Sequence, residues 1–216
     1  LIMKHKNVTV NSIFGIPVWQ TDPYPFSKKE IRFLKSLYSK VTENKGKNHT
    51  STDRYIFKHK ELKGVKKFVQ DNLDAYWHGM LAVSKESPLH ITQSWVNFNE
   101  KTTEHHSHRH TNSCLSGVMY VENTSPILFE KEKEHLILPF LSLKYTALNQ
   151  LNSPDLAVET KNGALLIFPS STMHRVAPNQ SENCRISISF NTWLSGNVGQ
   201  DVRLTELIVD EPKNKS

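Results

Sequence analysis

The pattern of hydrophobic and polar residues changes once along the chain, near residue 89. Before this position, hydrophobic residues recur at the three- and four-residue spacing of amphipathic helices. After it, hydrophobic and polar residues mostly alternate, which is typical of strands that bury one face. The first part of the chain is therefore expected to contribute helices, and the remainder to form a β-structure.

Two amphipathic helices are predicted in the first part. Ser27 is a good N-cap for a helix over residues 28–41, and a second helix is predicted over residues 62–82. Residues 7–19 are rich in β-branched side chains and are expected to form a strand pair or one bent strand. Residues 43–53 are polar and rich in turn formers, so a loop is expected there.

Short strands are predicted from residue 89 onward. Turn signals such as NG, PSS and NQSEN separate them, and this arrangement indicates a sandwich or barrel. Residues 133–152 are expected to form a long insertion that packs over the barrel, while the two helices support one sheet face. The predicted strands cover residues 89–99, 114–122, 127–131, 156–160, 164–169, 173–178 and 184–193.

The composition excludes several classes of protein. The 216 residues, 37% of them hydrophobic, suffice for one domain with a sizeable core. No run of about 18 apolar residues occurs, so no membrane partner is expected, and residues 1–10 lack the apolar stretch of a signal peptide. Cys114 and Cys184 do not lie in a CxxC pair, which argues against a disulfide framework or a zinc ribbon. We therefore expect a cytoplasmic protein.

The net charge of +6 reflects lysines that crowd the first third of the chain. A basic face attracts nucleic acid or another polyanion, so a nucleic-acid partner stays open. The alternative is a solvated helix face. That alternative is favoured because the lysines are not interleaved with aromatic residues as in a stacking platform.

Histidines are concentrated in one short segment, where four of the eleven lie between residues 105 and 110. On a strand, His108 and His110 would direct both imidazoles at one point; His106 shares their parity, whereas His105 does not. Two imidazole nitrogens at about 2.0–2.2 Å from a cation form half of a metal site. The alternative is a solvated, histidine-rich turn.

The third metal ligand must come from elsewhere, and His174 is the best candidate. It follows a predicted strand and a PSS turn, where the mouth of a barrel would lie. A purely structural histidine is the alternative at this position.

The last long strand places an arginine and hydroxyl groups on one face. Arg185, Ser187, Ser189 and Asn191 alternate there with a plain hydrophobic stripe. A guanidinium on the inner side of a barrel needs a partner, and its planar fork suits a carboxylate. That carboxylate belongs either to a ligand or to an internal Asp or Glu.

Two segments resemble a known family. HSHRHTNSCLSGVMYV and GALLIFPSSTMHRVAPNQSENCRISISFN are similar to the 2-oxoglutarate/Fe(II) oxygenases of bacteriophages and marine bacteria, over residues 95–193. The resemblance implies a double-stranded β-helix, that is, a jelly-roll or cupin-like barrel. Together with the two N-terminal helices that the residue pattern predicts on one sheet, this gives a mainly β fold with flanking α-helices. The resemblance also implies a single oxygenase-like domain, in which residues 1–88 are the N-terminal strand and supporting helices, 89–208 the jelly-roll core and 209–216 a polar tail.

The resemblance also implies a ligand set for iron. His108 and His110 correspond to the proximal ligand pair, and His174 corresponds to the distal histidine. The wider superfamily uses two histidines and one carboxylate, so His110 stands where an acid is usual. Glu104 swinging in, or His106 replacing His110, are the alternatives.

The resemblance further implies that Arg185 anchors the 5-carboxylate of 2-oxoglutarate, with Ser187 beside it. Tyr120 and Asn112 are further candidates for contacts with this cosubstrate. The implied enzyme is a 2-oxoglutarate-dependent dioxygenase that takes Fe(II), 2-oxoglutarate and O₂ and hydroxylates a substrate that the sequence does not identify. It would act in the host cytoplasm if phage-encoded. The alternatives are a cupin-like metalloenzyme that does not use 2-oxoglutarate, and a non-catalytic jelly-roll binding or virion-associated module.

Overall fold

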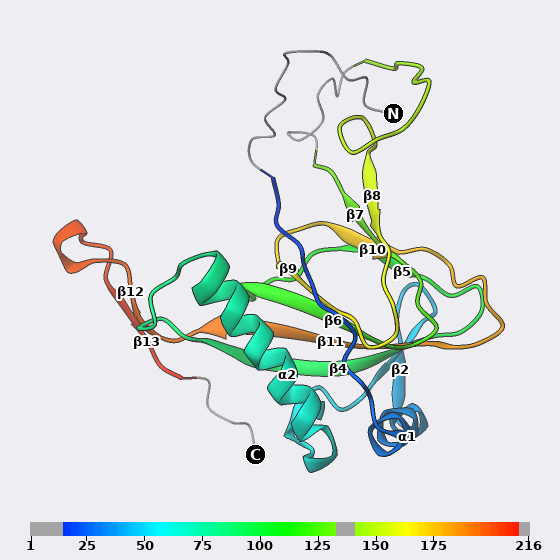
Figure 1. The fold of residues 1–216 in the computed structure, drawn as a ribbon, viewed down its shortest axis with the longest axis horizontal. Coiled ribbons are helices and arrows are strands. Elements are labelled where there is room, and N and C mark those ends of the chain that lie inside the picture. The colour runs from blue at the N-terminus through cyan, green and yellow to red at the C-terminus, as the bar shows by residue number, and fades with distance from the viewer. Residues whose placement is uncertain (1–14, 133–140, 212–216) are drawn as a thin grey trace.

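The computed structural model describes residues 15–132 and 141–211, which form two α-helices and three antiparallel sheets (Figure 1). The α-helices are α1 (Lys28–Ser36) and α2 (Lys63–Asp74), and a π-helical segment, η4 (Ala75–Met80), continues α2. Short 3₁₀ turns are η1 (Leu37–Ser39), η2 (Ile56–Lys58), η3 (Lys60–Leu62) and η6 (Asp201–Arg203). The strands are β1 (Trp19–Gln20), β2 (Val41–Glu43), β3 (His49–Ser51), β4 (Leu89–Asn99), β5 (His105–His108), β6 (Leu115–Glu122), β7 (Ile127–Glu130), β8 (Asp155–Val158), β9 (Leu165–Pro169), β10 (His174–Val176), β11 (Arg185–Leu194), β12 (Gly196–Val198) and β13 (Leu207–Val209).

A large and a small sheet form the body of the molecule. The large sheet has the order β1-β9-β6-β11-β4-β3-β2, and the small sheet has the order β5-β10-β7-β8. A two-stranded hairpin, β12–β13, projects from the end of the large sheet (Figure 1). The longest pairing joins β4 and β11, from Arg185 opposite Asn99 to Leu194 opposite Leu89. This central pair carries the predicted polar face that begins at Arg185.

The large and small sheets face each other across a hydrophobic layer. Tyr120, Leu166 and Phe168 of the large sheet pack there with Ile127 and Phe129 of the small sheet. Strand pairing does not close the two sheets into one barrel within the described residues. The predicted mainly β fold is thus confirmed as two facing antiparallel sheets with flanking helices.

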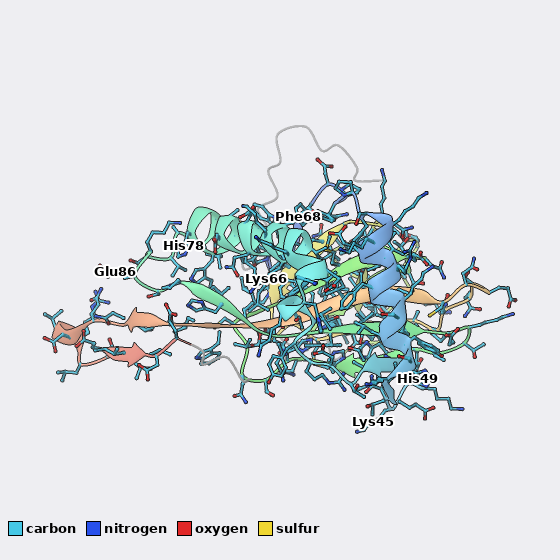
Figure 2. All side chains as sticks on the ribbon, turned by 90° about the horizontal axis from the view of Figure 1, so that it is seen from below. Lys45, His49, Lys66, Phe68, His78 and Glu86 are labelled. Atoms are coloured by element: carbon cyan, nitrogen blue, oxygen red, sulfur yellow. The ribbon has the colours of Figure 1, made fainter. Side chains whose placement is uncertain are left out.

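Both helices cover the outer face of the large sheet, as predicted. Leu34 of α1 and Val65 and Val69 of α2 are buried in one cluster with Ile186 and Ile188 of β11. Figure 2 shows α2 running along this side of the strands. Among the described residues, no helix is both long and apolar enough to cross a membrane.

The start of α1 follows the predicted capping chemistry. The Ser27 hydroxyl accepts a hydrogen bond from the Glu30 backbone N–H at 3.2 Å, and the Ser27 N–H donates to the Glu30 carboxylate at 2.7 Å. This reciprocal pair is a capping box, which satisfies two backbone groups that a helix start leaves open.

The loop predicted at residues 43–53 was wrong in part, because residues 44–48 form the turn of a β-hairpin and His49–Ser51 form its second strand, β3. β2 and β3 pair with each other, and β3 extends the large sheet beside β4. The Val96 N–H donates to the Ser51 hydroxyl at 3.1 Å, so a polar side chain fixes this strand to β4. Because β3 is held by such polar contacts, its residues do not show the hydrophobic alternation by which strands are recognised in a sequence.

Two other predictions fall partly outside the described residues. Of the strand expected at residues 7–19, residues 7–14 are not described, and strand pairing begins only at Trp19, opposite Ile167. Of the insertion expected at 133–152, residues 133–140 are not described. Residues 141–151 are all exposed and extend beyond the ends of β7 and β8, so this part does not pack over the sheets (Figure 1).

Candidate metal centre

Three histidines from two segments converge between the sheets. His108 of β5 lies directly opposite His174 of β10, with ring centroids 4.4 Å apart. His110 follows β5, where its backbone N–H donates to the Ser170 carbonyl at 3.0 Å. Its ring lies 5.0 Å from that of His108 and 5.2 Å from that of His174. One nitrogen of each imidazole lies within 4.8 Å of the others, and this is the one such group in the part of the chain that is described.

Backbone carbonyls fix the orientation of two of these rings. Nδ1 of His108 lies 2.8 Å from the His106 carbonyl oxygen, and Nδ1 of His174 lies 2.9 Å from that of Thr172. A carbonyl oxygen can only accept, so each Nδ1 carries the proton and donates. Nε2 of both rings is then left with its lone pair, which is how metal-binding histidines are prepared.

All three histidines are held in the neutral form. Burial, followed by the neighbouring His108, lowers the pKa of His110 to about 4 and that of His174 to about 3. Burial also lowers the pKa of His108 itself. Neutral imidazoles keep the lone pair that a metal ligand requires.

Arg185 lies fully inside, on the inner face of the large sheet. Its side chain is 2% exposed. Nη1 donates to the Asn99 side-chain oxygen and to the Ser187 hydroxyl, both at 3.3 Å, and the guanidinium lies 5.2 Å from the centre of the Tyr120 ring. Each of these neighbours is a neutral group.

No carboxylate of the described residues pairs with Arg185. Its Nε also lacks a hydrogen-bond partner within this part of the chain, and burial lowers the pKa of the guanidinium. An arginine nevertheless stays charged in a protein. The salt bridge to an internal Asp or Glu, which the sequence analysis gave as the alternative, is therefore not formed among these residues. The buried guanidinium of Arg185 faces the space between the sheets without a counter-charge.

The inner face of β4 indicates which end of this region is open. Gln93 is exposed, Trp95 is half-buried, and Asn97 and Asn99 are buried. Asn99 is paired with Arg185, whereas the Trp95 ring lies 6.2 Å from that of His110. Arg185 thus lies at the deep end, and the histidines lie toward the accessible end.

Of the other residues predicted to contact 2-oxoglutarate, two lie beside Arg185 and one does not. Ser187 and Tyr120 lie beside Arg185 as expected, and burial raises the pKa of Tyr120. Thr160 and Arg185 are close to the Tyr120 hydroxyl, but no hydrogen bond of standard geometry forms. Asn112 is exposed in the turn after His110, with a φ of 52° that asparagine tolerates. Asn112 therefore lies outside the buried group of site residues.

The alternative ligands lie outside the three-histidine group. Glu104 is exposed, and its backbone N–H donates to the Gly46 carbonyl at 3.0 Å. The ring of His106 lies 5.2 Å from that of His108, but His106 is not a member of the group.

The expectation from strand alternation that His105 points away from His108 was wrong, because the two rings lie only 4.8 Å apart. Simple alternation missed it because the register shifts along β5.

Comparison with known proteins places this region in a family context. Residues 93–191 match the family described as "Putative 2OG-Fe(II) oxygenase". No curated protein matches the sequence. This match confirms the predicted enzyme class, a 2-oxoglutarate-dependent dioxygenase, together with Fe(II) and 2-oxoglutarate as its cofactors.

Solved structures share the fold at low sequence identity. The carbocyclase SnoK from nogalamycin biosynthesis is 13% identical with a TM-score of 0.57, covering 93% of this chain and 90% of that one. A 2OG-Fe(II) oxygenase family protein from Burkholderia pseudomallei is 12% identical with a TM-score of 0.53, covering 81% and 83%. HygX from Streptomyces hygroscopicus, crystallised with nickel and 2-oxoglutarate, is 10% identical with a TM-score of 0.52, covering 82% of each chain. Residues 93–191, which carry the three histidines and Arg185, thus match the family described as putative 2OG-Fe(II) oxygenases, and most of the chain shares the fold of these solved structures.

Proposed function

We propose that this protein is an Fe(II)- and 2-oxoglutarate-dependent hydroxylase in which His108, His110 and His174 hold the iron and Arg185 binds the distal carboxylate of 2-oxoglutarate. The chain would form one oxygenase-like domain of the double-stranded β-helix type. The family match and the shared fold support the class, and the arrangement of the described side chains supports the residue roles.

The observation that carries the proposal is the buried, unpaired guanidinium of Arg185. An uncompensated charge in a protein interior costs several kcal/mol, so a stable fold retains it only where a ligand of opposite charge arrives. A carboxylate can accept two parallel hydrogen bonds from the guanidinium fork. Ser187 and Tyr120 would contribute hydroxyl groups beside it.

The three-histidine group fits a divalent cation. Its nitrogens are neutral, two rings have their tautomer fixed by carbonyls, and small side-chain rotations from the 4.8 Å span would close it on a metal. Without a carboxylate in this group, the centre carries one more positive charge than the usual two-histidine, one-carboxylate set. The negatively charged cosubstrate would balance that excess.

Iron(II) with 2-oxoglutarate and dioxygen supplies an oxidation in which 2-oxoglutarate becomes succinate and carbon dioxide while one oxygen atom enters a C–H bond of the substrate. The protein supplies position and exclusion of water. Arg185 would hold the far end of the cosubstrate at the deep end, and Trp95 with Gln93 would border the accessible end where the primary substrate approaches.

Succinate release tests this function directly. Wild-type protein with Fe(II) and oxygen should convert 2-oxoglutarate to succinate, slowly even without the primary substrate. Arg185→Met should abolish the conversion at low 2-oxoglutarate, because truncating one partner of a buried charge pair costs about 2–5 kcal/mol of binding.

The same assay separates the alternatives. A protein that binds iron but releases no succinate would favour a cupin-like metalloenzyme, and a chain that binds no metal would favour a non-catalytic module.

A further inference from the structure

We infer that His105 is a fourth histidine of this site and that its imidazole donates a hydrogen bond to the distal carboxylate of 2-oxoglutarate. The inference rests on the proposed function, since it concerns the cosubstrate of that reaction. An alternating strand would turn His105 away from His108, so its position needs a separate explanation.

A β-bulge turns His105 inward. His174 and Val176 on β10 are two residues apart, so their side chains point to the same side, and both are buried. Their partners on β5 are His108 and His105, which are three residues apart, and the register shifts between the two pairs. One extra residue in one strand is what a β-bulge inserts. Because directly opposed residues share a face, His105 and His108 both point between the sheets.

His105 lies one step deeper than His108, toward Arg185. Its ring lies 4.8 Å from that of His108, and two residues before it the Thr103 carbonyl accepts a hydrogen bond from the Asn179 backbone N–H at 3.0 Å. β10 also leads toward the deep end, where Asn179 donates to the Asn99 carbonyl at 2.9 Å. A dicarboxylate that reaches from the metal ligands to Arg185 would therefore pass His105.

Imidazole suits this position chemically. It offers at least one N–H donor in either protonation state. The donor would act together with the Arg185 Nε, which has no partner within the described residues. Losing one hydrogen bond to a charged group lowers affinity roughly 10- to 100-fold.

The test compares two keto acids on protein loaded with Zn(II), so that no turnover occurs. Isothermal titration calorimetry measures the binding of 2-oxoglutarate, which has the distal carboxylate, and of pyruvate, which lacks it. We expect His105→Phe to weaken 2-oxoglutarate binding roughly 10- to 100-fold, while pyruvate affinity and zinc content stay at the wild-type level. His105→Ala should show the same selective loss, and His105→Gln, which keeps an N–H donor, should retain most of the affinity.

The matched control is His78→Phe, at the end of η4 and remote from the inter-sheet site (Figure 2). The His78 side chain bonds only the Val83 carbonyl, at 2.9 Å, and this variant should bind both keto acids like the wild type. Unchanged 2-oxoglutarate affinity in both donor-free variants contradicts the inference. So does a parallel loss of both keto acids, because that would assign His105 to the metal end. If zinc-loaded wild-type protein binds no 2-oxoglutarate, the proposed function itself fails.

Discussion

At the scale of single residues, the proposed site consists of a charge without a counter-charge and of imidazole lone pairs without a hydrogen-bond partner among the described residues. Arg185 is almost fully buried among neutral groups, and three nearby imidazoles are held neutral with their tautomers partly fixed. The uncompensated charge of Arg185 disfavours the empty protein electrostatically, whereas the neutral imidazoles carry no charge and leave lone pairs free for a cation. Function and stability should therefore pull in opposite directions at Arg185.

Arg185→Met should stabilise the metal-free protein. Replacing an uncompensated buried charge by an apolar side chain of similar length removes a desolvation cost, and such replacements gain about 1–4 kcal/mol. Urea denaturation without metal or 2-oxoglutarate measures this. Arg175→Met is the control, since Arg175 pairs with Glu130 at 2.9 Å and with Asp155 at 2.6 Å and should give no gain. Destabilisation by Arg185→Met would instead assign the guanidinium a structural role.

His174→Ala should lose the metal. It removes one of three ligands together with an Nε2 that is already oriented for binding, so Fe(II) or Zn(II) affinity should fall by at least about 10- to 100-fold. Metal content after dialysis measures the loss. His90→Ala, which removes only a 2.7 Å contact with the Ser195 hydroxyl, should keep the wild-type content. Equal metal content in both variants would remove His174 from the ligand set.

At the scale of elements, the residue pattern predicted what local chemistry determines. The helix start at Ser27, the long β4 and the inward polar face of β11 follow from capping and from alternation. The β2–β3 hairpin and the inward turn of His105 do not. The first depends on hydrogen bonds to a strand far along the chain, and the second on a bulge between β5 and β10. Both depend on tertiary contacts, which the periodicity of a sequence does not reveal.

Ser27→Ala should destabilise the fold by about 1 kcal/mol, because a lost N-cap costs about 0.5–2 kcal/mol. The Glu30 N–H and carboxylate both lose a partner in this variant. Thermal or urea unfolding measures the change. Ser36→Ala in the last turn of α1 is the control, since that hydroxyl donates only to the Phe33 carbonyl. Equal effects of the two substitutions would contradict the capping account.

At the scale of the whole molecule, each layer has a separate task. The helices and the outer face of the large sheet form a hydrophobic core that holds the sheet. On its inner face, β6 and β9 pack against the small sheet through hydrophobic side chains, and β4 and β11 present the polar groups of the site. The residue pattern predicted the helix-covered face and the polar face of β11, and it brought His108, His110 and His174 together as one candidate metal site. It did not predict how far the sheets close, because strand pairing at the edges is decided by long-range contacts. Of the lysines in the first third, Lys66 lies on α2, on the helix side of the large sheet (Figure 2).

The most direct measurement of the central claim is the dependence of 2-oxoglutarate binding on metal in the wild-type chain. If three histidines and Arg185 form one site, calorimetry should detect 2-oxoglutarate binding with Zn(II) present and almost none after chelation. Arg185→Met should lose the zinc-dependent binding while keeping its zinc. Binding of equal strength with and without metal, or zinc-loaded protein that ignores 2-oxoglutarate, would contradict the account.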